Sequence, residues 1–337
     1  MAILVTGGSG FIGLALTRRL SEQGEMIHVL CRPNSEIYHL LLPNIKIFFG
    51  NIENPADVLS AMKGCDRVYH LAALAANWSP DFQHFYDVNV GGTRNVLTAA
   101  QSLSITKIVF TSTCLTFGNS NGVPVDESHP PPRKILTPYA RSKAKAEQLL
   151  QKIKTNQVEL VTVHPTRVFG PGLLTEGNAT TQMIRQYLDG KWHYILGDGQ
   201  AVGNYGYLPD IVDGFIQAMA HGRHGEAYLL GGENISFNDF FNAIRTVCDC
   251  SFPLFRIPRP FVIMFSHLEI LRARLFHSYP MISPEWVKLF SQNWAFSCNK
   301  ARSELNYQIT PFQEAIRQTV GWIVKKKEFQ NERTFPA

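Results

Sequence analysis

The 337-residue sequence lacks the features that mark several broad classes of protein. It has no low-complexity tract and no repeat of fixed period, so a repeat array is not expected. Its lysines and arginines are spread along the chain, without an aromatic-interleaved basic patch, and the net charge is +5. Nucleic acid is therefore not an expected partner. With 45% hydrophobic and 18% charged residues, the composition is that of a globular protein.

Metal-ligand spacing and a targeting segment are also missing. Met1 leads straight into an apolar run, without a basic stretch or a cleavage site, so we predict no signal peptide and a cytoplasmic location. None of the cysteines or the late histidines has the companions of a metal site; these residues are Cys31, Cys65, Cys114, Cys248, Cys250, Cys298, His193, His221 and His224. We predict six reduced thiols and no bound metal.

A glycine-rich turn follows the first apolar run. Residues 2–6 (AILVT) are typical of a buried strand, and they lead into TGGSGFIG and then into a helical pattern that ends at Gly24. Gly7 permits the tight turn, Gly10 lets the backbone approach a pyrophosphate, and Gly13 allows the helix to pack on the strand. The helix N-terminus adds free N–H groups and a partial positive charge. This order predicts a dinucleotide site.

Strand and helix patterns then alternate through the first half of the chain. We predict buried strands at 26–30, 46–49, 67–73, 107–113 and 158–163, with a long helix from about Val88 to Ser102. Such alternation predicts an α/β fold, a Rossmann-type doubly wound parallel sheet with ligands beyond the carboxyl ends of the strands.

The alternation becomes irregular from about Thr166, which predicts a smaller C-terminal substrate-binding lobe. We predict a dinucleotide-binding domain at 1–165 and a mainly substrate-binding lobe at 166–325, interleaved with the last sheet strands. Residues 326–337 are interpreted as a polar, frayed tail.

Tyr139 and Lys143 stand four residues apart in TPYARSKAKAEQLL, which is typical of the start of a helix. This spacing puts both side chains on one helix face. A nearby ammonium would stabilise the phenolate, and lowering a tyrosine pKa from about 10 toward 7 requires roughly 4 kcal/mol. The pair is a candidate acid/base site, although ordinary helix neighbours are the simpler interpretation of the spacing alone.

Arg32 follows the second predicted strand, where NAD-preferring proteins usually carry an acidic residue that binds the ribose. An arginine at this point would instead make a charge-assisted contact with a 2′-phosphate. We therefore favour NADP, with NAD as the alternative, although a solvated surface cation is the other interpretation of Arg32.

Several motifs together resemble those of the extended short-chain dehydrogenase/reductases, in the epimerase/dehydratase superfamily. They are TGGSGFIG, VYHLAA, FTST, YARSK and HPTRVFGPG, and the resemblance covers nearly the whole chain. The dihydroflavonol-reductase-like branch, which includes the hopanoid-associated sugar epimerases, is the most similar. The resemblance implies an NAD(P)-dependent enzyme, with a small molecule as its substrate.

Site residues are implied by this resemblance. Tyr139 would be the catalytic acid/base, Lys143 its ribose-binding partner, and Thr113 the hydroxyl that holds the substrate oxygen, with Ser112 as the fallback. The implied cofactor contacts are Gly7, Gly10, Phe11, Ile12, Gly13, Arg32, Asn51, Ile52, Leu71, Ala72, Ala73, Thr111, Ser112, Tyr139, Lys143 and Pro165. Asn89 is expected to brace the site. Asn51 departs from the family pattern, which commonly has an aspartate there, so we expect altered adenine recognition.

Three reactions share this implied site. Cys114 and Leu115 follow Thr113, where the dehydratases of the family have an Asp-Glu pair, so we reject dehydration. Nucleotide-sugar epimerases usually have an arginine before the position of Asp210, whereas this chain has Asn204 and no arginine there. That absence favours a reductase or dehydrogenase that interconverts an alcohol and a ketone on a bulky substrate. An epimerase is the alternative, with Arg256 or Arg259 as its cation, and a non-catalytic dinucleotide sensor is the second alternative.

Residues 253–277 mix bulky apolar side chains with four arginines. The stretch from Phe261 to Phe276 is too short and too interrupted to span a bilayer. The leading interpretation is a core-packing helix with a basic outer face. A lid over an apolar substrate and a surface that rests on a membrane are the alternatives. A homodimer is left open.

Overall fold

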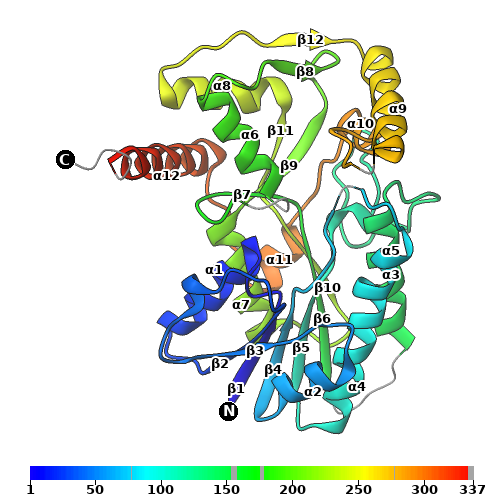
Figure 1. The fold of residues 1–337 in the computed structure, drawn as a ribbon, viewed down its shortest axis with the longest axis vertical. Coiled ribbons are helices and arrows are strands. Elements are labelled where there is room, and N and C mark those ends of the chain that lie inside the picture. The colour runs from blue at the N-terminus through cyan, green and yellow to red at the C-terminus, as the bar shows by residue number, and fades with distance from the viewer. Residues whose placement is uncertain (77, 153–157, 175–177, 277, 333–337) are drawn as a thin grey trace.

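The computed structural model describes residues 1–76, 78–152, 158–174, 178–276 and 278–332, except for the side chains of 327–332. A large parallel sheet with helices on both faces occupies the lower part of Figure 1, and a smaller lobe stands above the carboxyl ends of its strands.

The main sheet has seven strands in the order β10-β6-β5-β4-β1-β2-β3, and every neighbouring pair is parallel. The strands are β1 (Ala2–Thr6), β2 (Ile27–Cys31), β3 (Ile45–Phe49), β4 (Cys65–His70), β5 (Lys107–Thr111), β6 (Glu159–Pro165) and β10 (Ala227–Leu230). The order reverses between β1 and β4, which is the switch point where doubly wound sheets bind ligands. The predicted fold class is confirmed.

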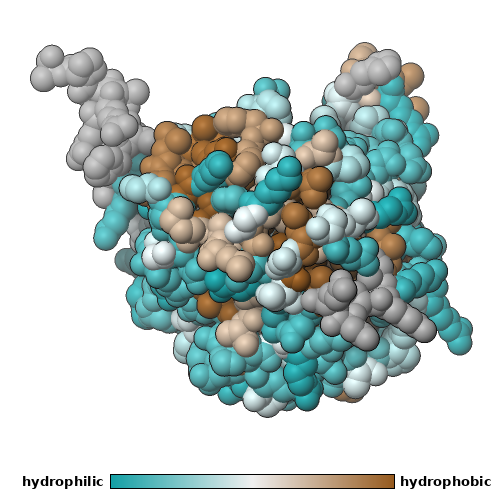
Figure 2. All heavy atoms as spheres, turned by 90° about the horizontal axis from the view of Figure 1, so that it is seen from below, coloured by the Kyte–Doolittle hydropathy of each residue, from teal (hydrophilic) through white to brown (hydrophobic). Residues whose placement is uncertain are grey.

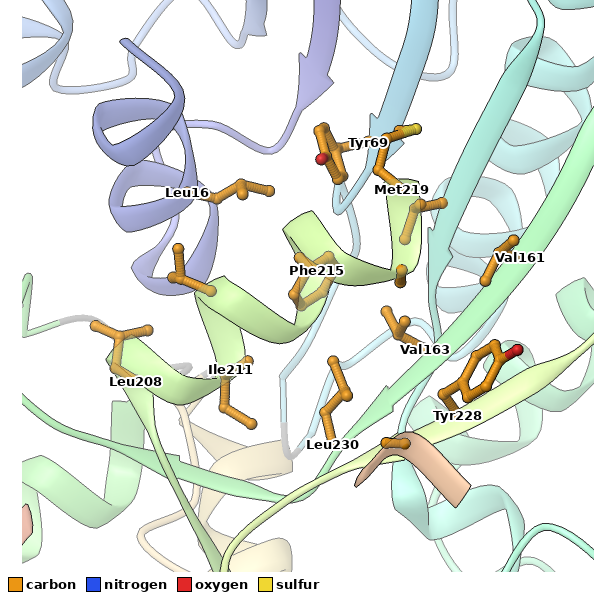
Figure 3. Close-up of a cluster of buried hydrophobic side chains, with 14 of the residues drawn as sticks. Leu16, Tyr69, Val161, Val163, Leu208, Ile211, Phe215, Met219, Tyr228 and Leu230 are labelled. Atoms are coloured by element: carbon orange, nitrogen blue, oxygen red, sulfur yellow. The ribbon is translucent and has the colours of Figure 1, made fainter. Parts of the chain in front are cut away.

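Helices cover the two faces of this sheet because alternate residues of each strand point to opposite sides. Ile3 and Val5 of β1 pack under α1 (Phe11–Glu22) and α7 (Leu208–His221). Ala2 and Leu4 face the opposite core, which α2 (Pro55–Met62), α4 (Gly92–Ser102) and α5 (Pro138–Lys152) complete. In Figure 3, Phe215 of α7 lies at the centre of the first core, among side chains from α1 and the strands. Both faces are therefore dry, as parallel sheets require.

The smaller lobe is built from two short sheets and five helices. One sheet has the order β11-β9-β7 and the other pairs β12 with β8. The strands are β7 (Arg167–Phe169), β8 (Tyr194–Leu196), β9 (Val202–Tyr207), β11 (Glu233–Ser236) and β12 (Phe255–Ile257); the helices are α6 (Ala179–Leu188), α8 (Phe237–Cys248), α9 (Arg259–Leu275), α10 (Pro284–Phe290) and α12 (Phe312–Glu332). A core rich in aromatic rings joins β7, β8, β9, α6, α8 and α12. After β7 the chain also returns to the main sheet, as α7, β10 and α11 (Asn299–Glu304).

Four short helical segments complete the described elements: η1 (Tyr38–Leu40), α3 (Gln83–Tyr86), η2 (Asp87–Gly91) and η3 (Cys114–Thr116). The predicted helix from Val88 begins instead with a π-helical turn, η2 (Asp87–Gly91), which leads into α4. The predicted strands at 67–73 and 107–113 end earlier, at His70 and Thr111, so their last residues form the loops at the carboxyl edge.

The prediction of a frayed tail is wrong up to Glu332, because α12 continues to that residue. Lysine, glutamate and glutamine are good helix formers, so a polar composition does not end a helix. Residues 333–337 lie outside the described residues.

The prediction of six reduced thiols is wrong for one pair. Cys248 and Cys250 form a disulfide, with their Cα atoms 5.1 Å apart, while the other four cysteines are free and buried. α8 ends at Cys248, and Asp249 takes a left-handed conformation with φ of 48°. This turn brings the two sulfur atoms together.

The outer face of α9 is apolar, which contradicts the leading interpretation of a basic outer face. Phe261, Met264 and Leu268 are each more than half exposed. Among the described residues, no helix is both long enough and apolar enough to cross a bilayer.

The face of the molecule at the bottom of Figure 1 is hydrophilic around most of its outline, with hydrophobic residues gathered in its upper half (Figure 2).

Candidate active site

The glycine turn after β1 forms a cradle that side chains would fill. Gly7 has φ of 75°, and a Cβ atom on it would lie 2.7 Å from the backbone nitrogen of Ala72. A Cβ atom on Gly13 would lie 2.1 Å from the carbonyl oxygen of Gly7. The sequence analysis did not select Gly8. A Cβ atom on Gly8 would lie 2.5 Å from Cγ1 of Val29 in β2. Without side chains here, α1 begins directly against the ends of β1 and β4.

The N-terminus of α1 offers a site for an anion. Gly10 is its N-cap residue, with an extended backbone, and the first turn contains no acidic side chain. The first N–H groups of a helix have no partner within the helix, and they carry a partial positive charge. Phe11 is buried in the core and Ile12 is partly buried beside it, so the first residues of α1 present backbone to a ligand. The cradle fits a dinucleotide pyrophosphate.

The other predicted cofactor residues fall into two groups along the carboxyl edge. Arg32 is exposed directly after β2, and Asn51 is exposed after β3. The Asn51 side chain donates to Glu53 and accepts from the Glu53 backbone N–H, while Ile52 packs its side chain against Gly92. On the other side of the switch point lie the ends of β4, β5 and β6, with Leu71, Ala72, Ala73, Thr111, Ser112 and Pro165.

Two buried polar atoms on these strand ends have no partner among the described residues. They are Oγ1 of Thr111, the last residue of β5, and Nδ1 of His164, which precedes Pro165 in β6. A buried hydroxyl or imidazole nitrogen without a partner costs free energy, so these atoms mark a place where a polar ligand is accommodated. They lie on the same edge as the glycine cradle, and the residues present therefore fit a bound nicotinamide dinucleotide.

The start of α5 carries Tyr139 and Lys143. Thr137 begins the helix, since its hydroxyl accepts from Ala140 N–H, and Pro138 occupies the first turn, where its missing N–H costs nothing. One turn separates Tyr139 from Lys143, as the sequence predicts. Lys143 is 1% exposed, and its ammonium lies 4.2 Å from the ring centre of Phe110 in β5. The aromatic face thus compensates part of the buried charge.

Burial shifts both members of the pair in a direction that the sequence analysis did not anticipate. It lowers the pKa of Lys143 to about 7, although Glu147 opposes the shift. Burial also raises the pKa of Tyr139, with Cys114 and Glu147 acting in the same direction. The expected lowering of the tyrosine pKa is therefore wrong for the protein without a ligand. Desolvation disfavours the charged form of each group, and it is the largest cause of both shifts.

Thr113 caps the short helix η3, next to the end of β5. It is 8% exposed, and its hydroxyl oxygen accepts from Leu115 N–H at 3.4 Å. The neighbouring Ser112 hydroxyl donates to Glu147 and is committed there. Of the two hydroxyls that the sequence analysis considered, that of Thr113 has the weaker protein contact.

Glu147 joins α5 to two strand ends, and the sequence analysis missed it. Besides Ser112 after β5, its carboxylate binds Nε2 of His164 in β6 at 3.1 Å. Burial alone would raise the pKa of Glu147, but His164 and the hydrogen bonds of Ser112 and Thr116 hold that pKa below its usual value. Its position four residues after Lys143, on the same helix face, was the available signal.

A second buried network connects β1, β4 and α4. Ala72 N–H donates to the Thr6 hydroxyl, which donates to Nδ1 of His70 at 2.7 Å. Nε2 of His70 contacts the Thr93 hydroxyl at 3.1 Å, and Thr93 donates to the Asn89 carbonyl. The Thr93 hydroxyl proton is committed to that carbonyl, so His70 carries its proton on Nε2. Burial lowers the pKa of His70 to about 3, and the charge of Lys143 adds to this effect.

The Asn89 side chain carries this network to the tyrosine. Its Oδ1 atom accepts from Leu74 N–H at 2.8 Å, and its Nδ2 atom donates to the Ser142 hydroxyl at 2.8 Å. Ser142 in turn donates to the carbonyl of Tyr139 at 2.7 Å. Asn89 is 1% exposed and lies in the π-helical turn η2. The bracing role that the resemblance implies thus has a defined set of contacts.

Arg167, at the start of β7, is a half-buried cation that the sequence analysis did not select. It donates to the Tyr205 hydroxyl at 3.2 Å, and its guanidinium lies 4.5 Å from the ring centre of Phe290. Its Nη2 atom is buried without a partner among the described residues. Asn204, in contrast, is saturated by hydrogen bonds within the lobe. Arg256 and Arg259 are exposed at the outer end of the lobe, on β12 and α9 (Figure 1).

The comparisons with known proteins agree on one family. Residues 3–231 match the model of the NAD dependent epimerase/dehydratase family. The chain is 29% identical to a putative dihydroflavonol 4-reductase of Synechocystis sp., over 94% of this chain and 93% of that protein. It is 27% identical to a 3 beta-hydroxysteroid dehydrogenase/Delta 5→4-isomerase of Mycobacterium tuberculosis, over 98% and 94%.

A solved structure shares the same architecture. The UDP-glucuronic acid 4-epimerase from Bacillus cereus, in complex with UDP-glucuronic acid and NAD, superposes with a TM-score of 0.76 at 26% identity. The match covers 96% of this chain and 99% of the epimerase. Both the large sheet and the smaller lobe therefore have counterparts in a single known fold.

The burial of Lys143 predicts a pH dependence of stability. Its pKa of about 7 in the folded chain lies below the ordinary 10.5, so the unfolded state binds more protons between these values. The free energy of unfolding should then rise with pH, by up to about 1.4 kcal/mol per unit. Lys143→Met should flatten this slope between pH 7 and 9 in urea titrations. Lys145→Met, exposed on the same helix, is the control that keeps it; equal slopes in both variants would contradict the prediction.

Proposed function

The chain belongs to the NAD dependent epimerase/dehydratase family, and from this membership we propose that it is an NADP-linked carbonyl reductase or alcohol dehydrogenase. Among the reactions of the extended short-chain dehydrogenase/reductases, we propose the interconversion of an alcohol and a ketone. The observation that carries the proposal is the pairing of Tyr139 with Lys143 on α5, beside Thr113 and anchored by Asn89. The similarity to a dihydroflavonol 4-reductase and a hydroxysteroid dehydrogenase supports a bulky substrate.

In the proposed mechanism, the bound nicotinamide supplies the hydride to the carbonyl carbon, or accepts it in the reverse direction. The Thr113 hydroxyl holds the substrate oxygen, and Tyr139 donates the proton that this oxygen takes up. With a raised pKa, Tyr139 is a neutral phenol at neutral pH and carries the proton that this step needs. Lys143 stands one turn away, where it can hold the ribose and restore the proton.

Arg167 is proposed to contact an oxygen of the substrate. It follows the carboxyl end of β6, and its field reaches Cys114, the residue next to Thr113. A guanidinium with an unpartnered buried nitrogen can donate to a carbonyl, hydroxyl or acidic oxygen. Three aromatic side chains around it, Tyr205, Phe237 and Phe290, would contact an apolar body.

We propose that the cofactor is NADP rather than NAD, within a family that is NAD dependent as a whole. Arg32 is exposed immediately after β2, on the side of the switch point away from Tyr139. A guanidinium there would bind a 2′-phosphate, and the first turn after β2 has no acid at position 31 or 32 to take its place. We also propose a cytoplasmic location, which the four free, buried cysteines support and the Cys248–Cys250 disulfide opposes. A homodimer is compatible with these proposals.

Tyr139→Phe should lower kcat for a bulky ketone by about 10² to 10⁴, because it removes the proton donor. The measurement is the loss of NADPH absorbance over a panel of flavonoid, steroid and terpenoid ketones. Tyr38→Phe, at an exposed tyrosine, is the control. Unchanged turnover in Tyr139→Phe would refute the mechanism. Interconversion of UDP- or GDP-sugars without net cofactor consumption would identify an epimerase, and dinucleotide binding without either reaction would identify a sensor.

Arg32→Ala should weaken NADP binding by roughly 10- to 100-fold, the value of a charge-assisted hydrogen bond of about 1.5–3 kcal/mol. NAD binding should change little, since NAD has no 2′-phosphate. Calorimetric titration of the purified protein with each dinucleotide gives both affinities, with Arg94→Ala at an exposed position of α4 as the control. Equal affinities of the parent protein for NADP and NAD would overturn the cofactor proposal.

Arg167→Gln should raise KM for the best ketone of the panel at least tenfold, with a smaller effect on kcat. A buried charged hydrogen bond to the substrate oxygen would be lost, while the reacting groups stay in place. Arg167→Lys should restore part of the affinity, and Arg94→Gln should behave as the parent. Loss of kcat at unchanged KM, in a variant with the parent's melting temperature, would rule out the substrate contact.

A further inference from the structure

α9 displays its large apolar residues to the outside and buries small ones. Its buried residues are Ser266, Glu269 and Ala273. Phe261, Met264, Phe265, Leu268, Leu271 and Leu275 are between 46% and 66% exposed. Their spacing of three or four residues aligns them along one side of the helix, opposite the buried residues. This is the reverse of the pattern by which a surface helix packs on its own protein.

The apolar surface continues past the end of the helix. Phe276, Tyr279 and Met281 are 71–82% exposed. Nine of the nineteen large hydrophobic side chains exposed in the described chain thus lie within residues 261–281. We call these nine residues the α9 surface. Scattered exposed apolar residues are ordinary, but a contiguous group of this size marks an interaction site.

This segment is held in a fixed shape. Glu269 accepts two hydrogen bonds from Arg272 and a third from Met281 N–H. Arg272 also donates to the Tyr279 carbonyl and the Ser278 hydroxyl. These contacts tie 278–281 back against α9, so Tyr279 and Met281 are presented together with the helix. The exposure of the α9 surface is therefore built into the fold.

The charges around the α9 surface have one sign. Glu269 is the single acidic residue between positions 253 and 281 in the sequence, and Arg272 neutralises it. Arg256, Arg259 and Arg274 are exposed, and none of the ion pairs among the described residues includes them. Two of them flank the ends of α9. An apolar stripe with arginines at its edges matches the boundary between the headgroups and the acyl chains of an anionic bilayer.

We propose that the α9 surface docks the protein onto an anionic membrane, with α9 lying in the plane of the interface. The 17-residue helix is about 25 Å long at 1.5 Å per residue, and it would lie on a bilayer rather than cross it. A second copy of the chain is a poorer occupant, since it would bring uncompensated arginines toward arginines. Anionic lipid supplies the missing negative charge.

The docking surface contacts the loop after β4 at one end. Tyr279 packs edge-on against Trp78, with ring centres 5.7 Å apart. Ala273 and Arg274 line a hollow of about 270 Å³ with Trp78 and Phe82. Trp78 belongs to the loop after β4, which Asn89 holds through Leu74. The proposal is independent of the reaction, but it would bring an apolar substrate in the bilayer close to this loop.

Vesicle flotation of the purified full-length protein tests the proposal. The parent should float with vesicles of 70% phosphatidylcholine and 30% phosphatidylglycerol, and at least tenfold less with phosphatidylcholine alone. Leu268→Glu should reduce flotation at least tenfold, since it introduces a charge at the centre of the stripe. Leu41→Glu, at an equally exposed leucine elsewhere, should float as the parent does. Melting temperatures equal to that of the parent establish that each variant is folded.

The arginines provide a second test with a different readout. Arg259→Gln and Arg274→Gln should each weaken binding to the anionic vesicles roughly fivefold and reduce its salt dependence. No flotation of the parent, or equal flotation of Leu268→Glu and Leu41→Glu, would overturn the proposal. A parent dimer in sizing chromatography that Leu268→Glu converts to a monomer, without flotation of either, would overturn it in favour of an interface between two copies.

Discussion

The hydrogen bonds of Asn89 hold together the three segments on which the site depends. The amide oxygen of Asn89 fixes Leu74 in the loop after β4, and its amide nitrogen reaches Ser142 on α5. Ser142 then holds the carbonyl of Tyr139. Asn89 lies in the π-helical turn η2, and from there its side chain reaches the loop after β4. Because both amide ends are used, α5 cannot move away from the sheet edge without leaving buried polar groups unpaired.

Burial of ionisable groups is the second constraint of this site. Lys143 and His70 are nearly inaccessible, and both have lowered pKa values. The interior compensates only part of this cost, through the ring of Phe110 and the bonds of His70 to two hydroxyls. Unpartnered atoms such as Oγ1 of Thr111 add to it. Local violations of the rules for a stable core are expected where a protein keeps room for a ligand.

The smaller lobe shows how aromatic packing and charge can be combined. Arg167 is enclosed by Tyr205, Phe237 and Phe290, whose rings face the guanidinium. A planar cation of this kind can lie in an apolar environment because the rings replace part of its hydration. The same lobe extends to α9, where large apolar side chains are exposed. Its inner surface therefore carries a cation among rings, and its outer surface carries apolar side chains with cations at their edges.

The sequence by itself determined the order of strands and helices in the first half of the chain, the glycine turn around Gly7 and Gly13, and the pairing of Tyr139 with Lys143. These features depend on residues within a few positions of one another, so periodicity, spacing and motifs reveal them. Tertiary structure alone decided the direction of the Tyr139 pKa shift, the partial burial of Arg167 and the outward face of α9. Each of these depends on which distant segments surround a side chain. The spacing of apolar residues along a helix is the same whether these residues face the core or the outside.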